Sequence, residues 1–197
     1  MKTLIVATQN KGKVLEIKEM LRDLDCEVMT MGEAGLDREI EENGTTFEEN
    51  AVIKAEALKA YTDAIILADD SGLEIDYLNK EPGVYSARYL GKDTPYTVKN
   101  QMILERLKDA SPEERTARFV CAMAIAGKNI ETQVVRETIE GYIGYEAKGE
   151  NGFGYDPIFY VSEYNISTAE MSSEQKNAIS HRGKALRAIT ERLKGVM

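Results

Sequence analysis

Two adjacent carboxylates, Asp69 and Asp70, follow a short apolar run in the segment LADDSGLEID. Residues 64–68 are expected to form a buried strand, and neighbouring residues on an extended strand point to opposite faces. We therefore expect the two carboxylates to do different jobs. One would be hydrogen-bonded by backbone amides of a Ser71-Gly72 turn, and the other would face a cleft. A strand-ending Asx turn explains the same pair without any chemistry.

A divalent metal would give one of these acids a chemical role. Mg²⁺ keeps several waters and usually takes one or two carboxylates together with substrate phosphates, so a single Asp needs a second ligand. Thr46 and Glu49 fit a helix capping box, which gives Glu49 a structural role. Glu41 and Glu42 lie in a loop that makes no structural demand on them. The candidates for the second ligand are Glu41, Glu42, Glu48 and Glu49.

The segment TQNKGK, residues 8–13, joins the end of an expected strand to a helix predicted from Lys11 to Leu24. A helix start exposes unpaired N–H groups and a partial positive charge. Gly12 permits close backbone approach, and Lys11 and Lys13 add full charges, so this turn is a plausible phosphate site. It is not a P-loop, because the required glycine spacing is missing. The structural alternative is a capped helix with two solvated lysines.

Near the C-terminus, ISHRGKALRAI combines Ser180, a fair N-cap, with three basic residues in the next helical turn: His181, Arg182 and Lys184. Cations at a helix start oppose the helix dipole. Their presence suggests a compensating anion, such as a phosphate or a base oxygen. His181 is the only histidine of the chain, and a lone histidine is more often structural than catalytic.

The segment GENGFGYDPIF, residues 149–159, places glycines around Phe153 and Tyr155. Aromatic rings held on such a loop can stack on a planar ligand. A tight loop whose aromatics only cover the core is the structural alternative.

Strands and helices alternate along the chain around an antiparallel pair, which predicts an α/β fold with a mixed sheet. Strands are expected over residues 3–8, 26–30, 64–68, 118–126, 132–143 and 156–161. Helices are expected over residues 11–24, after the Thr46 cap, after a Thr94 N-cap with Pro95 in the first turn, and at the C-terminus with Ala185, Leu186, Ile189 and Leu193 on one face.

Composition narrows the classes of function. A net charge of −9 argues against broad electrostatic binding of nucleic acid, which needs a basic face. No apolar run approaches the roughly 18 residues that span a bilayer. The first apolar run is too short for a signal-peptide core, so a cytoplasmic protein is expected. Cys26 and Cys121, the two cysteines, are expected to be free, buried thiols in a reducing compartment.

Six segments taken together resemble the inosine triphosphate pyrophosphatase family, and the resemblance runs from Leu4 to Leu193. It implies one two-lobed domain over residues 1–197, with an elongated mixed β-sheet, flanking helices and a central nucleotide-binding cleft. It also implies a homodimer that hydrolyses ITP, dITP or XTP to the monophosphate and pyrophosphate with Mg²⁺. The segments are TQNKGKVLEI, TFEENAVIKA, LADDSGLEID, PGVYSARY, GFGYDPIF and SHRGKAL.

The resemblance also assigns roles. Glu42 and Asp70 would hold the metal, Asp70 would also accept a proton, and Phe153 would stack on the purine. Gln9, Glu150 and Asn151 depart from the family pattern, which leaves fine selectivity open. The implied substrate-binding residues are Thr8, Gln9, Asn10, Lys11, Gly12, Lys13, Lys54, Ser71, Phe153, Gly154, Tyr155, Asp156, Lys176, His181 and Arg182.

Two other functions stay open on the sequence. One is a related pyrophosphatase for modified pyrimidine or methylated nucleotides. The other is a nucleotide-binding sensor without turnover, which the set of Asp70, Glu42 and lysines disfavours. A nucleic-acid-binding module is the least favoured reading of an acidic chain.

Overall fold

The computed structural model describes residues 2–194 of the 197-residue chain. Compact packing divides the described chain into two units. Unit 1 comprises residues 1–70, 121–137 and 182–197, and unit 2 comprises residues 71–120 and 138–181. The break falls directly after Asp70, so the two aspartates end the first segment of unit 1.

The strands form a mixed sheet in the order β2-β1-β3-β4-β5-β6-β7, which confirms the predicted α/β class. Strand β1 is parallel to both β2 and β3, whereas β6 is antiparallel to both β5 and β7. Two residues join β4 to β5, as an antiparallel hairpin requires. The bounds are β1 Lys2–Ala7, β2 Cys26–Thr30, β3 Ile65–Ile75, β4 Thr116–Gly127, β5 Ile130–Ile143, β6 Phe159–Val161 and β7 Ile166–Ser167.

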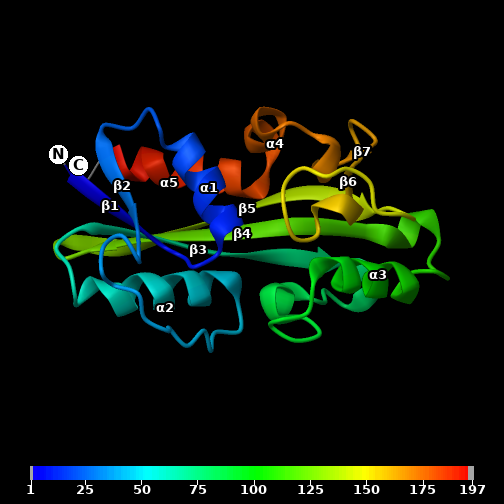
Figure 1. Cartoon of the computed structure of the whole chain (residues 1–197), viewed down its shortest axis with the longest axis horizontal. Coiled ribbons are helices and arrows are strands. Elements are labelled where there is room, and N and C mark those ends of the chain that lie inside the picture. Colours follow the sequence, from blue (N-terminus) through cyan, green and yellow to red (C-terminus); the bar gives the residue numbers. More distant parts are fainter. Residues whose placement is uncertain (1, 195–197) are drawn as a thin grey trace. The chain divides into compact units, whose positions relative to one another are not determined.

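In unit 1, helices cover both faces of the strands (Figure 1). Helices α1 (Lys11–Met20) and α5 (His181–Lys194) lie on one face, and α2 (Phe47–Lys59) lies on the other. The α1/α5 side has an apolar core, because its residues recur at helical spacing and meet strand residues of one face. That core includes Leu4, Val6, Ile17, Leu67, Met123, Ala185, Leu186, Ile189 and Leu193.

Unit 2 has its own core beside α3 (Tyr96–Arg106), and the short helix α4 (Ser173–Ile179) lies on the opposite face of its strands (Figure 1). The buried cluster joins apolar residues from strands, α3 and the loop before β6. Its members include Leu73, Ile75, Ile103, Leu107, Phe119, Ile143, Tyr155 and Phe159.

Several predicted boundaries are wrong. Helix α1 ends at Met20 rather than Leu24, and the strand expected over residues 64–68 continues to Ile75. Helix α3 has no side-chain N-cap, since Pro95 occupies the cap position and the Thr94 hydroxyl donates to the Leu90 carbonyl at 2.6 Å. The segment predicted as a strand over residues 156–161 begins as a 3₁₀ turn.

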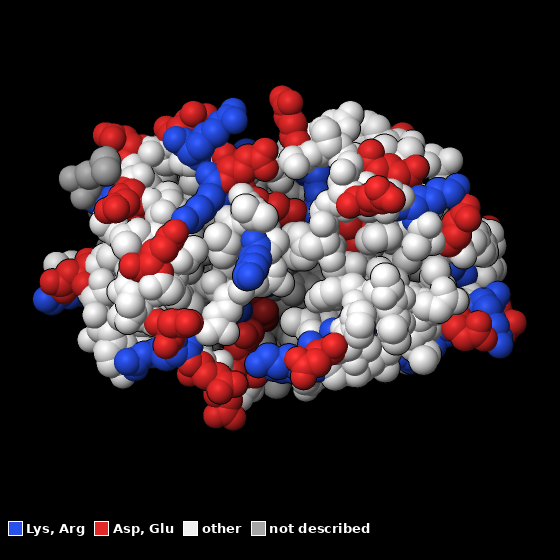
Figure 2. Space-filling view, in the orientation of Figure 1, with Lys and Arg blue, Asp and Glu red and all other residues white. Residues whose placement is uncertain are grey.

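Within residues 2–194 no helix combines the length and the apolar character that a bilayer span requires. Figure 2 shows Lys and Arg side chains interspersed with Asp and Glu on the face drawn, and no broad basic surface is seen on that face. Both cysteines are free thiols, as predicted. Cys121 is buried, whereas Cys26 is half-buried and not buried as predicted.

Candidate active site

Strand β3 carries Asp69 and Asp70 through the sheet rather than into a turn. The expected Ser71-Gly72 turn is absent from this described strand, which stays extended through both residues. Gly72 is needed there because a Cβ atom would lie 2.5 Å from the Gly83 carbonyl oxygen. The two carboxylates therefore point to opposite faces of one strand, as the alternation of a strand dictates.

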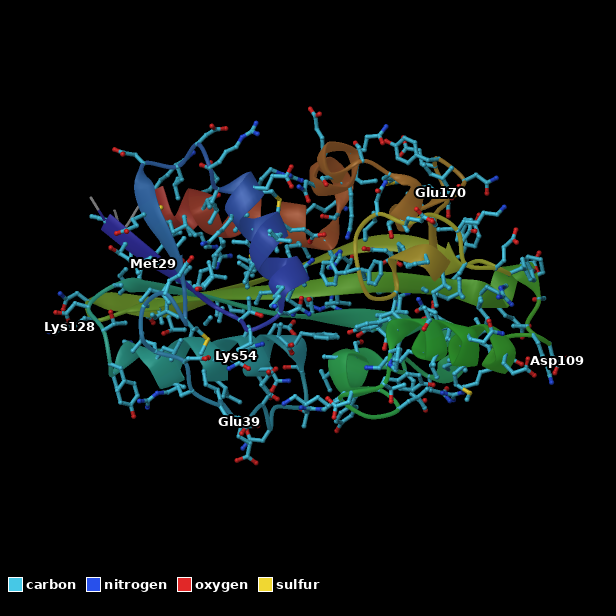
Figure 3. All side chains as sticks on the ribbon, viewed as in Figure 1. Met29, Glu39, Lys54, Asp109, Lys128 and Glu170 are labelled. Atoms are coloured by element: carbon cyan, nitrogen blue, oxygen red, sulfur yellow. The ribbon has the colours of Figure 1, made fainter. Side chains whose placement is uncertain are left out.

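Asp70 faces the α2 side, where Lys54 and Glu42 lie. The Lys54 ammonium is 3.6 Å from Asp70 Oδ1 and 3.2 Å from Glu42 Oε2, and it donates to the Asp69 carbonyl at 2.6 Å. Lys54 lies on the side of α2 that faces the sheet (Figure 3). The structure thus brings Glu42, Lys54 and Asp70 together, although Glu42 and Asp70 lie far apart in the sequence.

The environment of Asp70 disfavours a charged carboxylate in the protein alone. Burial raises the pKa of Asp70 to about 6, because Lys54 and Lys13 offset only part of the burial and Glu42 and Asp69 add repulsion. Its Oδ2 atom is buried and has no hydrogen-bond partner among residues 2–194. Such an oxygen is a ready ligand for a cation.

Two of the other glutamate candidates, Glu48 and Glu49, have structural partners, and the third, Glu41, is exposed. Glu49 accepts from the Thr45 and Thr46 amides and completes the predicted capping box at the start of α2. Glu48 lies 3.5 Å from Arg136. Of the four candidates, Glu42 is the one whose carboxylate shares Lys54 with Asp70.

Asp69 faces the α1/α5 side and is fully buried. Lys13 from the first turn of α1 forms an ion pair with its Oδ1, and Arg182 Nε lies 3.2 Å from its Oδ2. The Cys121 thiol donates to Oδ2 at 3.0 Å. Burial alone would raise the pKa of Asp69, but Lys13 and Arg182 outweigh it and hold that pKa well below its usual range.

Arg182 has compensating anions within the chain. Its NH1 atom contacts Glu16 at 2.5 Å, in addition to the Asp69 contact. Two carboxylates of the protein therefore meet this guanidinium. Glu16 was missed by the sequence analysis, although it lies three residues after Lys13 on the same helix face. The substrate-binding role of Arg182 stays a prediction.

The start of α1 is capped by its own side chains. Asn10 is the N-cap and its Oδ1 accepts from the Lys13 amide at 3.1 Å. The Thr8 hydroxyl accepts from the Asn10 amide, and Gln9 donates to Asp37 at 2.9 Å. Because β1 and β3 are parallel, with Ala7 opposite Ala68, this turn begins beside Asp69. The predicted phosphate role of residues 8–13, with Lys11 and Gly12, is untested.

In unit 2, Asp156 organises the glycine-aromatic loop. Its Oδ2 accepts from Lys176 Nζ at 2.6 Å and from the Phe153 amide at 2.9 Å, and its Oδ1 accepts from the Thr168 hydroxyl at 2.8 Å. Gly152 has φ +72°, and a Cβ atom there would collide with Asp156. Thr168 was missed, because nothing local in the sequence links it to a loop twelve residues earlier.

Phe153 and Tyr155 differ in burial, which bears on the two roles considered for this loop: stacking on a ligand and covering the core. Tyr155 is buried, packs edge-on against Tyr96 at 5.2 Å between ring centroids, and donates to the Ser86 carbonyl at 2.6 Å. Phe153 is half-buried, and the Lys176 ammonium lies 5.0 Å from its ring centroid. The core alternative therefore describes Tyr155, and Phe153 remains the candidate for stacking.

The remaining candidates in unit 2 are His181, Ser71 and Gly154. His181 begins α5 as predicted, is buried, and stacks on Phe119 with 4.9 Å between ring centroids. Ser71 is half-buried on β3. The Gly154 carbonyl accepts from Asn100 Nδ2 at 3.1 Å. Their substrate contacts stay predictions.

A cavity in unit 1 is separate from these clusters. Its volume is about 540 Å³, and none of the predicted site residues lines it. Met29, labelled on β2 in Figure 3, is one of its lining residues, with Thr3, Ile5, Leu36 and Tyr61. It carries no part of the candidate site.

The clusters suit a cation and an anionic ligand. Within residues 2–194, no group of three or more His, Cys, Asp or Glu side chains is arranged as a complete metal site. Two carboxylates, Glu42 and Asp70, are nevertheless what a small hard cation takes when substrate phosphates supply further oxygens. With the α/β fold around them, these two carboxylates are the described residues that could hold such a cation.

Comparison with known proteins places the chain in a family. It belongs to the Ham1 family, which matches residues 4–192, so the predicted family is confirmed. A Bacillus subtilis protein named dITP/XTP pyrophosphatase is 48% identical over 193 residues, covering 98% of each chain. A Bacillus anthracis protein of the same name is 48% identical over 195 residues, covering 98% of this chain and 96% of the other.

Solved structures agree with the fold. The Staphylococcus aureus Ham1 protein superposes with a TM-score of 0.87 at 40% identity and covers 100% of both chains. A Coxiella burnetii HAM1 protein superposes with a TM-score of 0.88 at 42% identity, covering 99% of this chain and 100% of that one.

Proposed function

We propose that this chain hydrolyses non-canonical purine nucleoside triphosphates, namely ITP, dITP and XTP, to the nucleoside monophosphate and pyrophosphate. At the level of class it is an enzyme, a nucleoside triphosphate pyrophosphatase, by its family and by relatives that carry that name. The observation that carries the finer proposal is the meeting of Glu42 and Asp70 at one lysine, with Asp70 Oδ2 buried and unsatisfied among the described residues.

The proposed cofactor is Mg²⁺, held by Glu42 and Asp70. When bound, the ion supplies positive charge to the phosphates and lowers the pKa of a coordinated water. In the protein alone, burial raises the pKa of Asp70 to about 6, and a cation bound to the carboxylate would favour its charged form. Asp70 is proposed as the proton acceptor on the strength of the family resemblance.

Cationic groups of unit 1 are proposed to bind the triphosphate. Lys54 stands beside both carboxylates, and the turn over residues 8–13 offers backbone N–H groups and the exposed Lys11. Lys13 is half-buried and forms an ion pair with Asp69 on β3. It therefore has a structural partner and is also a candidate phosphate contact. Charge neutralisation and in-line alignment are the contributions expected from these residues.

The base is proposed to be recognised by residues of unit 2. Phe153 would stack on the purine, and Lys176 would donate to the 6-oxo group that inosine and xanthosine carry. Adenine presents an amino donor at that position, so a donor would face a donor and leave buried groups unpaired. Arg182 and backbone amides near His181 are the further candidates for this contact.

A homodimer and a cytoplasmic location are proposed from the family resemblance. Apolar residues of the segment 72–95 are exposed in unit 2, among them Tyr85 at 60% and Leu90 at 45%. Such residues suit an interface better than water. Light scattering on the purified chain would give twice the monomer mass if the proposal is right.

Product analysis with ITP and Mg²⁺ tests the reaction. Monophosphate plus pyrophosphate is expected, whereas diphosphate plus phosphate would overturn the proposed bond cleavage, and no turnover would favour a sensor. Values of kcat/KM for ITP, XTP, GTP and ATP test base selection. Equal values for ITP and ATP would reject the 6-oxo argument, and preference for a pyrimidine or methylated nucleotide would point to the related enzymes.

A further inference from the structure

Asn50 is a fully buried amide on α2 that nothing above uses. Its exposed fraction is 0%. It precedes Lys54 by four residues, so both side chains lie on the same face of the helix. That face meets the sheet beside Asp70, because Lys54 from it contacts Asp70 and Glu42.

One end of the Asn50 amide holds the loop that carries Glu42. The Gly44 backbone N–H donates to Asn50 Oδ1 at 2.8 Å. An N–H group can only donate, so this bond fixes which end of the amide is the oxygen. A Cβ atom at Gly44 would lie 2.7 Å from the same Oδ1. The loop therefore approaches α2 this closely only with glycine, two residues after Glu42.

The other end of the amide is unsatisfied. Asn50 Nδ2 is buried and has no hydrogen-bond partner among residues 2–194. A buried polar group without a partner costs about 1–3 kcal/mol. A leucine or alanine would avoid that cost but could not hold Gly44. The hydrogen bond to the Glu42 loop is thus obtained at a local cost in stability.

We propose that Asn50 is a positioning residue for the metal site: through Gly44 it holds Glu42 where its carboxylate meets Asp70. Asn50 itself contacts neither the metal nor the substrate in this role. The inference rests on the proposed function, because it takes Glu42 and Asp70 as the metal ligands. Residues that orient metal ligands typically change metal affinity by about 10- to 100-fold when removed.

The test measures Mn²⁺ binding to the full-length protein by electron paramagnetic resonance, without nucleotide and without turnover. Asn50→Ala removes the bond to Gly44 and is expected to weaken Mn²⁺ binding by about 10- to 100-fold. Asn50→Asp keeps an oxygen facing Gly44 and is expected to retain most of the affinity. Asn43→Ala makes the same chemical change at an exposed position of the same loop and serves as the matched control.

A double-mutant cycle separates positioning from general stability. If Asn50 acts through Glu42, then Asn50→Ala causes no further loss of Mn²⁺ affinity in the Glu42→Gln background. Amide hydrogen exchange at Gly44 should quicken in Asn50→Ala and stay slow in Asn50→Asp. Circular dichroism confirms that every variant is folded at the temperature of measurement.

The outcomes distinguish this inference from the proposed function. Suppose that Glu42→Gln weakens Mn²⁺ binding, as the metal assignment requires. The role of Asn50 alone is then overturned if Asn50→Ala binds Mn²⁺ normally. It is also overturned if Asn50→Ala lowers the Mn²⁺ affinity by the same factor in the unmodified and the Glu42→Gln backgrounds. Normal binding in Glu42→Gln overturns the metal assignment and this inference with it. If the unmodified protein binds no Mn²⁺ on its own, the same titrations are run with a non-hydrolysable ITP analogue, because substrate phosphates supply part of the proposed coordination. Absence of Mn²⁺ binding to the protein in that case too overturns the metal assignment and this inference with it.

Discussion

Asp69 and Asp70 have identical side chains at neighbouring positions of β3, but their surroundings shift the pKa of the two carboxyl groups in opposite directions. On the α1/α5 side, Lys13 and Arg182 outweigh burial and depress the pKa of Asp69. On the α2 side, burial prevails and raises the pKa of Asp70 to about 6. The charge of Asp69 is therefore balanced by cations of the protein, whereas the Oδ2 atom of Asp70 has no hydrogen-bond partner among residues 2–194.

The aromatics of the unit 2 loop repeat this contrast. Tyr155 is buried, with its ring against Tyr96 and its hydroxyl on the Ser86 carbonyl. Phe153, two residues earlier, is half-buried beside Lys176. Asp69 and Tyr155 are buried among partners within the protein. Asp70, by contrast, has an unsatisfied oxygen among the described residues, and the Phe153 ring is only half-buried. The contrast predicts which substitutions change activity and which change stability.

Asp70→Asn should cause the largest loss of activity. Removing a general base typically costs about 100- to 10,000-fold in rate, and the substitution also removes a proposed metal ligand. The fold should survive, because Asp70 has no hydrogen bond through Oδ2 and gives up only a 3.6 Å contact with Lys54. Pyrophosphate release from ITP with Mg²⁺ gives kcat, and urea unfolding gives stability. Near-normal kcat would show that the role assigned to Asp70 is wrong.

Asp69→Asn should instead cause the largest loss of stability. It leaves Lys13 and Arg182 without their shared buried carboxylate, and breaking a buried ion pair in this way costs about 3–5 kcal/mol. Asp63→Asn is the matched control, since Asp63 is also paired, with Lys128 at 2.9 Å, but both side chains are exposed. Exposed pairs contribute about 0–1 kcal/mol. Equal free energies of unfolding for the two variants would show that the buried ion pairs of Asp69 stabilise the fold no more than an exposed pair does.

Local features of the sequence predicted the elements around these residues well. The capping box of Thr46 and Glu49 is a contact within one helical turn, so the start of α2 was predicted correctly. Strand β2 lies at the predicted residues 26–30, and the strands predicted over residues 118–126 and 132–143 correspond to β4 and β5. The family resemblance then selected Glu42 from four glutamates, and the structure places Glu42 at Lys54.

Long-range partners could not be predicted from local pattern. The polar run from Asp69 to Gly72 looks like a turn, yet it remains a strand because distant groups satisfy it. Arg182 reaches Asp69 across 113 positions of the sequence, and Ser86 accepts from the Leu73 amide at 2.9 Å. The ion pair of Arg182 with Glu16 is another long-range contact, across 166 positions, that no local pattern indicates.

Phe153→Ala should weaken substrate recognition without disturbing the metal site. Stacking of a base on an aromatic ring is worth about 1–3 kcal/mol, so kcat/KM for ITP should fall about 5- to 150-fold. Mn²⁺ affinity should stay unchanged, because the metal ligands proposed here lie in unit 1. Steady-state kinetics and Mn²⁺ titration on the same preparation check both expectations. Unchanged kcat/KM would remove Phe153 from the proposed base site.

Tyr155→Phe should have the smallest effect, and on stability alone. The substitution keeps the ring that packs against Tyr96 and removes the hydroxyl that donates to the Ser86 carbonyl. Loss of one such hydrogen bond costs about 1 kcal/mol in the free energy of unfolding. Urea unfolding measures that cost, and kcat/KM for ITP should remain normal. A large drop in kcat/KM with unchanged stability would mean that the Tyr155 hydroxyl meets substrate, and the contrast with Phe153 would then fail.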